Sequence, residues 1–209
     1  MNKKLSDFLA KSYTKKFDAN YKMMIPPFRI SDFSKLTPGE AKEHFEWFIG
    51  EVPKRIEYLK ELLSNDGIED ILDYTPESLI PLWDWYEGKI KIEKISKEKY
   101  EKELSETPEW VHPYIKDEDL SIDTLKYCMD VSIYFAEVMI RNNANKIIWG
   151  FFTKPKNHVS VNQPTLLGFK GRMNLDPYLI LTNTSRKSSR EKCKTRLYDI
   201  YNVWLQYIE

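Results

Sequence analysis

The sequence has few cysteines and no long apolar run, and both shortages limit the classes of protein it can belong to. Its 209 residues include two cysteines, Cys128 and Cys193. No segment approaches the roughly 20 consecutive apolar residues that a membrane span requires. Asp7 and Lys11 interrupt the apolar residues near the start, which therefore does not match a signal peptide. We expect a cytoplasmic chain with reduced thiols and no membrane contact.

Catalytic and metal-binding signatures are also missing. Seven glycines are present, and none forms the glycine-rich spacing with which backbone amides hold a phosphate group. The Gly-x-Ser-x-Gly elbow of serine hydrolases is absent. The three histidines, His44, His112 and His158, lie in separate segments and make no metal-ligand spacing. These absences favour a chain without cofactor or metal, and a non-enzyme over an enzyme.

The net charge of zero hides a strong asymmetry along the chain. Residues 1–29 carry seven basic and two acidic side chains, residues 30–140 carry 13 and 26, and residues 141–209 carry 12 and four. One interpretation is that acidic helices pack beside basic segments in one domain, with most charges solvated. The other is that the basic C-terminal third faces an acidic partner or a phosphate backbone.

Composition and hydrophobic periodicity predict an α+β fold in a single domain over residues 1–209. Apolar residues make up 42% of the chain and charged residues 31%, which is typical of a globular protein. We expect a helical part over 1–143, with an irregular insertion at about 89–120 that contains a helical turn or two around 96–105 and a loop after it. A small, mostly antiparallel sheet of about four strands in 146–182 and a closing C-terminal helix then occupy 144–209.

Helix start signals stand out at three places. Thr37-Pro38 supplies an N-cap hydroxyl and a proline at the first helical position, with a glutamate three residues after the cap. The apolar stripe behind it keeps its phase across Pro53, which predicts one bent helix. Thr75-Pro76 predicts a short helix, and Ser121 predicts a long one that ends at 142–143.

The two ends of the chain give further expectations. Apolar residues at helical spacing among lysines predict a short amphipathic helix over 3–17. A final helix is expected to begin around 185–190 and to run to the end of the chain. The strands of the expected sheet are the short β-rich runs at 146–152, 158–161, 165–169 and 178–182.

One polar stripe on the third helix is a candidate site. Asp130, Tyr134, Glu137 and Arg141 follow one another at helical spacing, so they share one face. Two carboxylates, a phenol and a guanidinium can perform acid–base chemistry in a cleft. The same stripe can be a Glu–Arg pair and a hydrogen-bonded tyrosine on a solvated face. We favour this second, structural interpretation.

An aromatic group and a run of hydroxyls and cations give two more candidates. Trp83 and Tyr86 share a helix face, whereas Trp85 points elsewhere; an exposed Trp85 would be an anchor for a protein partner. A second group would bind an anion if it opened a helix, although a plain N-cap is the interpretation we prefer. That candidate anion site consists of Ser185, Arg186, Ser188 and Arg190.

Short motifs in residues 121–209 carry a resemblance to known sequences. They are Tyr134-Phe135-Ala136-Glu137-Val138, Arg141-Asn142, Trp149-Gly150, Asn162-Gln163-Pro164 and Asp176-Pro177. In this order they resemble a group of uncharacterised bacterial proteins, some of which are thought to be immunity proteins of polymorphic toxin systems. The resemblance implies no catalytic residue, and it implies that Glu137 and Trp149 define the fold as much as any function.

The sequence therefore leads to three functional hypotheses. The first is a non-enzymatic protein-interaction module, most concretely a cytoplasmic immunity protein that binds a toxin by surface complementarity. The second is an enzyme of unknown substrate that uses Asp130, Tyr134, Glu137 and Arg141. The third and weakest is nucleic-acid binding through the basic C-terminal third. Another protein is the expected partner.

Overall fold

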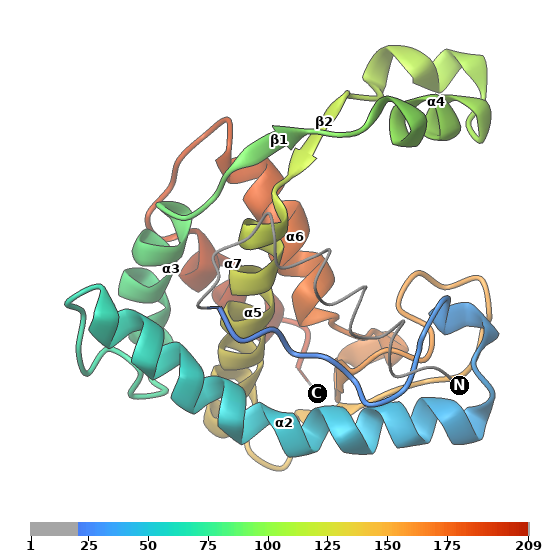
Figure 1. Ribbon diagram of the computed structural model, residues 1–209. Coiled ribbons are helices and arrows are strands. Elements are labelled where there is room, and N and C mark those ends of the chain that lie inside the picture. Colours follow the sequence, from blue (N-terminus) through green and yellow to red (C-terminus); the bar gives the residue numbers. More distant parts are fainter. Residues whose placement is uncertain (1–20, 209) are drawn as a thin grey trace.

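The computed structural model describes residues 21–208 and has an α+β fold dominated by helices (Figure 1). The helices are α2 (Pro38–Asn65), α3 (Leu79–Glu87), α4 (Lys97–Ser105), α5 (Ile122–Asn142), α6 (Pro177–Ser188) and α7 (Arg196–Leu205). The strands are β1 (Ile92–Lys94), β2 (Glu118–Leu120), β3 (Ile148–Gly150) and β4 (Thr165–Leu167). The predicted fold class is confirmed. The helix expected over 3–17 lies outside the described residues.

Helix α5 is the central element of the fold. It packs against α2, α3 and α6, and more than half of its residues are buried (Figure 1). Its apolar side chains join those of α3 in one core, where Trp83, Tyr86, Tyr134 and Phe135 are among the largest fully buried side chains. Each such aromatic ring buries a large apolar area, which stabilises the core together with the aliphatic side chains around it.

Two of the three helix start signals, at Thr37 and Ser121, are confirmed in atomic detail, whereas the Thr75 side chain makes no capping hydrogen bond although a short 3-10 turn and α3 follow it. The Thr37 side chain accepts a hydrogen bond from the Glu40 amide, and the Glu40 carboxylate accepts one from the Thr37 amide, which completes a capping box. The Ser121 hydroxyl caps α5 by accepting from the Thr124 amide at 3.1 Å. Helix α2 continues through Pro53 to Asn65 as one element. Local signals thus suffice to place these helices.

The sheet expected within 146–182 is smaller than predicted. Only β3 and β4 pair there, antiparallel, with Trp149 opposite Leu166. The runs 158–161 and 178–182 are not strands: the first forms turns, and the second lies inside α6. Asp176 caps α6 by accepting from the Leu179 amide, and Pro177 occupies its first turn. This start signal outweighs the β-propensity of the apolar run behind it.

The closing helix is also divided into two parts. Helix α6 ends at Ser188, and α7 begins only at Arg196, whereas the prediction has one helix from 185–190 to the end. Cys193 therefore lies between two helices and not inside one. Both cysteines are free thiols, Cys128 being buried and Cys193 half-buried. Helix α7 packs against α3 and buries Leu197 and Tyr201.

The region in which we expect an insertion forms a projection with its own strands and helices. We call residues 92–120 the arm. Strands β1 and β2 pair antiparallel at its base, with Ile92 opposite Leu120, and they lead to α4 and the 3-10 helix η3 (Glu109–Tyr114). Figure 1 shows the arm extending away from the helical body, with α4 at its far end. This is the feature of the fold that the sequence predicts least well.

Candidate functional site

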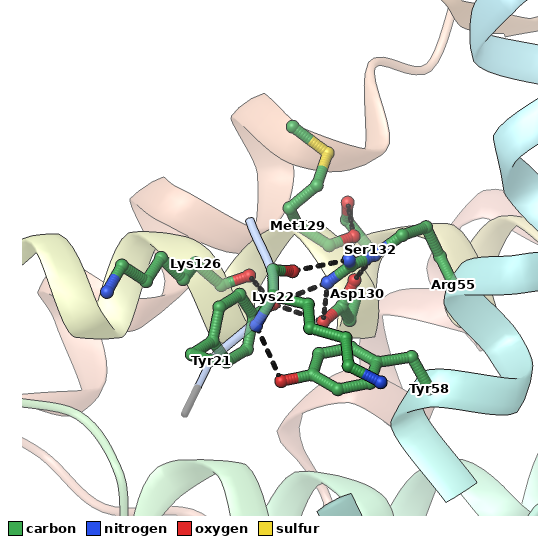
Figure 2. Close-up of polar contacts among 8 residues, drawn as sticks. All are labelled: Tyr21, Lys22, Arg55, Tyr58, Lys126, Met129, Asp130 and Ser132. Atoms are coloured by element: carbon green, nitrogen blue, oxygen red, sulfur yellow. Dashed lines mark hydrogen bonds and ion pairs between the residues drawn. The ribbon is translucent and has the colours of Figure 1, made fainter. Parts of the chain in front are cut away.

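The stripe residue Asp130 belongs to a buried ionic cluster (Figure 2). Both of its carboxylate oxygens accept from the Arg55 guanidinium, at 2.6 Å from Nε and 2.7 Å from Nη2. The Tyr21 hydroxyl also contacts Asp130, and it accepts from Arg55 Nη2 at 2.9 Å. Arg55 Nη1 donates to the backbone carbonyl of Lys22 at 2.6 Å. The cluster ties residues 21–22 to α2 and α5.

The electrostatics of this cluster favour a structural role. Burial raises the pKa of Asp130, and the hydrogen bonds and positive charge of Arg55 oppose that rise. Burial also raises the pKa of Tyr21, with the Asp130 charge adding to the increase. Asp130 is only 1% exposed, and both of its oxygens already accept hydrogen bonds from Arg55 or Tyr21, so a substrate has no access to the carboxylate. Asp130 is therefore unsuited to general acid–base work in this arrangement.

The stripe residue Tyr134 is fully buried in a second, separate hydrogen-bond network. Its hydroxyl accepts from the Tyr74 amide at 2.9 Å and pairs with the Ser78 hydroxyl at 2.7 Å. Burial raises its pKa, and these two hydrogen bonds oppose the rise. Tyr134 thus fixes the chain between α2 and α3 against α5.

Glu137 and Arg141 complete the stripe near its outer end. Glu137 accepts from the Trp149 indole at 2.9 Å and lies 3.7 Å from Arg141 Nε. The Arg141 guanidinium lies 3.4 Å from the centre of the Tyr74 ring. These contacts anchor β3 and the loop before α3 to α5. The stripe therefore lies against three different partners and does not converge on one cavity.

Trp85 is not the exposed anchor that the aromatic group was expected to offer. It is only 9% exposed, and its indole donates to Asp66 at 2.7 Å. Tyr127 packs edge-on against its ring at 5.7 Å between centroids. Trp83 and Tyr86 are fully buried, as the core interpretation predicted. Helix α3 is covered by α5 and α7, which explains why both of its faces are apolar.

The candidate anion site lies at the wrong end of a helix. Ser185, Arg186 and Ser188 occupy the last turn of α6, where the helix dipole favours cations over anions. Ser185 and Ser188 are buried and bind Tyr86 and Glu87 through their hydroxyls. Arg186 donates to Asp119 of the arm at 2.9 Å. Arg190 follows the helix as an exposed residue.

The arm is built from local signals. Ser96 caps α4 by accepting from the Lys99 amide at 3.2 Å, and the His112 ring binds the Thr107 carbonyl at 3.0 Å. The Arg186–Asp119 contact and the strand pair hold its base to the body. Neither α4 nor η3 contains a buried residue. The tip of the arm is thus ordered by its own contacts and remains open to solvent.

Two aromatic side chains are exposed at the tip of the arm. Trp110 is 76% exposed and Tyr114 is 78% exposed, and both lie in η3. They have the highest exposure among the large hydrophobic residues that the structure describes. Indole and phenol rings lose free energy when they remain in water, and they supply much of the energy of protein interfaces. The tip is therefore a candidate contact surface.

A groove runs beneath the arm, between its inner side and α6. Its volume is about 350 Å³, and it is lined by Tyr114 and Ile115 of the arm and by Arg186 and Arg190. Burial alone would raise the pKa of Asp119 at the base of this groove. The hydrogen bond and the charge of Arg186 act against burial and help to lower that pKa. The structure thus brings two of the candidate anion residues to the arm, although not to a helix N-terminus.

A separate apolar pocket lies between α2, α5 and the start of α6. Its volume is about 340 Å³. Its aromatic lining residues are Phe33, Trp47, Phe48, Trp149 and Tyr178, together with the imidazole of His44. Pockets of this volume and lining are of the kind that hold small molecules.

The charged side chains that line the pocket are all acidic. Asp32 and Asp176 line it, and no lysine or arginine does so among the described residues. Burial raises the pKa of Asp176, and its hydrogen bond from the Leu179 amide opposes the rise. His44 is 5% exposed, and its Nδ1 has no hydrogen-bond partner within residues 21–208. Burial lowers its pKa, so the ring is neutral near pH 7.

Two further kinds of site have no counterpart in the described part of the chain. No group of three or more His, Cys, Asp or Glu side chains in residues 21–208 is arranged to hold a metal ion. No helix within those residues is both long and apolar enough to cross a membrane.

Comparison with known proteins identifies no relative. No protein-family model, no curated protein and no solved structure shows a significant match to this chain. The resemblance of residues 121–209 to immunity proteins therefore stays a hypothesis, and the function has to be inferred from the molecule itself.

Sequence reasoning missed the two features that the structure makes most prominent. Trp110 lies between Pro108 and Pro113, a context that indicated only an irregular loop. The helical turns expected around 96–105 are present as α4, which Ser96 caps, whereas the strands at the base of the arm and the exposure of Trp110 were not expected. The pocket residues come from segments 24–33, 44–48, 129–132, 149, 163–164 and 176–178, and no local pattern joins them.

Proposed function

We propose that this protein is a non-enzymatic protein-interaction module whose contact surface is the tip of the arm. The observation that carries this proposal is the exposure of Trp110 and Tyr114 at 76% and 78% on an ordered projection. A tryptophan that is held in place without being buried loses little conformational entropy when it enters a partner's pocket. Most of the Trp110 surface is then available for binding.

The charge of the arm indicates the chemistry of the partner. Residues 92–120 contain nine acidic side chains and five lysines. An acidic projection with aromatic anchors complements a basic protein surface with an apolar hollow. Long-range attraction accelerates association with such a surface, and salt slows it. We therefore expect a basic protein as the partner.

The test is a comparison of variants, because capture of a protein from a lysate proves little alone. Proteins retained from the source cells by the native chain are identified, and the Kd of each purified candidate is measured. Trp110→Ala and Tyr114→Ala should each raise the Kd of the genuine partner by at least about tenfold, since anchor residues contribute about 2 kcal/mol or more. The native complex also weakens as salt is raised.

A matched control comes from the opposite part of the chain. Tyr207 is 42% exposed near the C-terminus, so Tyr207→Ala removes a partly exposed aromatic ring outside the arm. It leaves the Kd unchanged if the arm is the contact surface. Equal binding by the native chain and by the Trp110→Ala, Tyr114→Ala double variant refutes the proposal.

The immunity role is the most concrete form of this proposal. An immunity protein needs complementary charge and anchors on its surface and needs no catalytic group. Co-expression with a toxin encoded in a neighbouring gene tests it: the native chain protects cells, and the Trp110→Ala, Tyr114→Ala double variant protects them less. Absence of any toxin gene nearby, or equal protection by both chains, counts against the immunity role.

The two alternative functions receive less support. The stripe of Asp130, Tyr134, Glu137 and Arg141 is divided among separate structural contacts, which disfavours a joint catalytic role. Nucleic-acid binding through the C-terminal third would need its cations free for phosphates. Arg186 is engaged by Asp119, and Arg196 is buried and donates to the Glu191 carbonyl.

A further inference from the structure

The apolar pocket between α2, α5 and α6 has walls and charges that suit one class of ligand. Trp47 and Trp149 are the largest of its aromatic lining residues, and Phe48 packs edge-on against Trp149 at 5.1 Å between ring centroids. Aromatic faces carry partial negative charge, and they attract cations most strongly when water is excluded. The walls can therefore bind an apolar ligand or an organic cation.

The charged groups of the pocket discriminate between these two ligands. Asp32 and Asp176 line it, whereas no cationic side chain of residues 21–208 does. Asp32 has a local counter-charge in Lys35, at 3.2 Å, on the solvent side. Asp176 is half-buried at the start of α6, and its carboxylate matches the positive end of that helix. An anion would meet two carboxylates here, so the pocket disfavours it.

His44 provides an independent sign that this is a binding site. His44 lines the pocket and is only 5% exposed, and its Nδ1 lacks a hydrogen-bond partner in the described chain. Phe33 and Trp47 surround the ring, with centroids 5.1 Å and 5.6 Å away. Buried polar atoms almost always have a hydrogen-bond partner, so the Nδ1 atom is available to a ligand in the pocket. As a neutral ring, His44 adds no repulsion toward a cation.

From this combination we propose that the pocket binds a small organic cation with an apolar body, such as an aryl-alkyl or alkylated ammonium compound. The aromatic walls hold the apolar body and the face of the cation, and the Asp176 carboxylate supplies the counter-charge. The volume of about 340 Å³ admits a ligand of this size. The site is distinct from the arm and does not depend on the proposed protein partner.

The test uses pairs of probes that differ in charge and hardly in shape. Calorimetric titration at pH 7.5 compares phenethylamine, a cation at this pH, with neutral 2-phenylethanol. A second pair is choline and its neutral analogue 3,3-dimethylbutan-1-ol. The expected result is that at least one cation binds about tenfold or more tightly than its neutral counterpart. Equal affinity within both pairs, or no binding by any of the four probes, overturns the proposal.

Variants assign the preference to the pocket. Asp176→Asn keeps an N-cap, because asparagine caps helices as well as aspartate does, and it reduces the cation preference to less than about threefold. Trp47→Leu, which removes a wall, lowers cation affinity more than neutral affinity. Asp70→Asn is the control: Asp70 is exposed and outside the pocket, so the preference remains.

Folding and independence are checked with the same proteins. Circular dichroism shows whether Asp176→Asn is folded; if it is not, Asp32→Asn and Trp47→Leu decide the matter by the same criterion. The Trp110→Ala, Tyr114→Ala double variant retains cation binding, so failure of the arm proposal and failure of this one are separable. A cation preference that survives both Asp176→Asn and Trp47→Leu places the site elsewhere and refutes the assignment.

Discussion

At the scale of single residues, Arg55 and Asp130 are the most consequential pair. They are 75 positions apart, yet both are buried and bound to each other through two hydrogen bonds. Breaking one side of a buried ion pair leaves the other charge without compensation, which costs about 3–5 kcal/mol. We therefore expect Asp130→Asn to lower the free energy of unfolding by about that amount in urea denaturation.

A control separates this effect from a general loss of charge. Glu57 pairs with Lys60 on the surface of α2, so Glu57→Gln changes the free energy of unfolding by less than about 1 kcal/mol. The double variant Arg55→Met, Asp130→Leu recovers part of the loss, because no unpaired charge then remains buried. A loss below about 1 kcal/mol for Asp130→Asn would contradict the structural role of the cluster.

His44 makes stability depend on pH. Burial holds its pKa below the ordinary value of 6.5, so the unfolded chain binds the proton more strongly than the folded one. The contribution of the neutral His44 ring to the free energy of unfolding is complete above about pH 6.5, and it is lost as the pH falls through the lower pKa of the folded state. The free energy of unfolding should therefore decrease between pH 7.5 and 5.5 less in His44→Gln than in the native chain.

The matched control for this pH effect is on the arm. His112 lies in η3, away from the pocket, and its ring contacts the Thr107 carbonyl. The variant His112→Gln should therefore keep the native dependence of stability on pH. If His44→Gln and the native chain lose stability in parallel over this range, the imidazole is not the group responsible.

At the scale of elements, a glycine pair offers a direct comparison. Gly168 follows β4 with φ +109°, and a Cβ there would lie 1.9 Å from the Lys146 carbonyl oxygen. Gly50 lies within α2 with nothing within 4 Å of its Cβ position. Gly168→Ala should lower the free energy of unfolding by more than about 2 kcal/mol, whereas Gly50→Ala raises it by up to about 1 kcal/mol. Thermal denaturation of both variants measures the difference.

The elements also show how far the sequence could lead. The capped starts at Thr37 and Ser121 depend on hydrogen bonds within one helical turn, so local patterns predict them. The run 178–182 was predicted as a strand from its apolar and β-branched residues, but the Asp176-Pro177 start and packing against α5 make it a helix. Propensity over five residues is weaker than a cap joined to a buried face.

The candidate site was predictable only in part, for the same reason. Asp130 and Tyr134 were correctly placed on one face of α5, but their partners come from α2 and from the loop before α3. Nothing in the spacing of the stripe reveals Arg55 or Tyr74, because contacts between distant segments depend on how helices pack. The pocket and the arm tip depend on such contacts even more.

At the scale of the whole molecule, stability is unevenly distributed. Helix α5 is buried on most sides, whereas α4 and η3 bury no residue. Segments with few buried contacts open locally at low free energy, while core amides exchange only when the whole protein unfolds. Hydrogen exchange should therefore be slowest in α5 and faster by orders of magnitude in α4. Similar protection of the two helices would show that the arm is covered in solution.

The arm also makes the molecule easy to observe. The protein has six tryptophans. Trp110 alone is exposed, and the other five are buried or half-buried in the body. Indole emission shifts to longer wavelength and becomes open to collisional quenching in water. The Trp110 indole is thus an intrinsic fluorescent probe of the arm. A partner that covers it should protect its emission from quenching by acrylamide, so binding can be followed without a label.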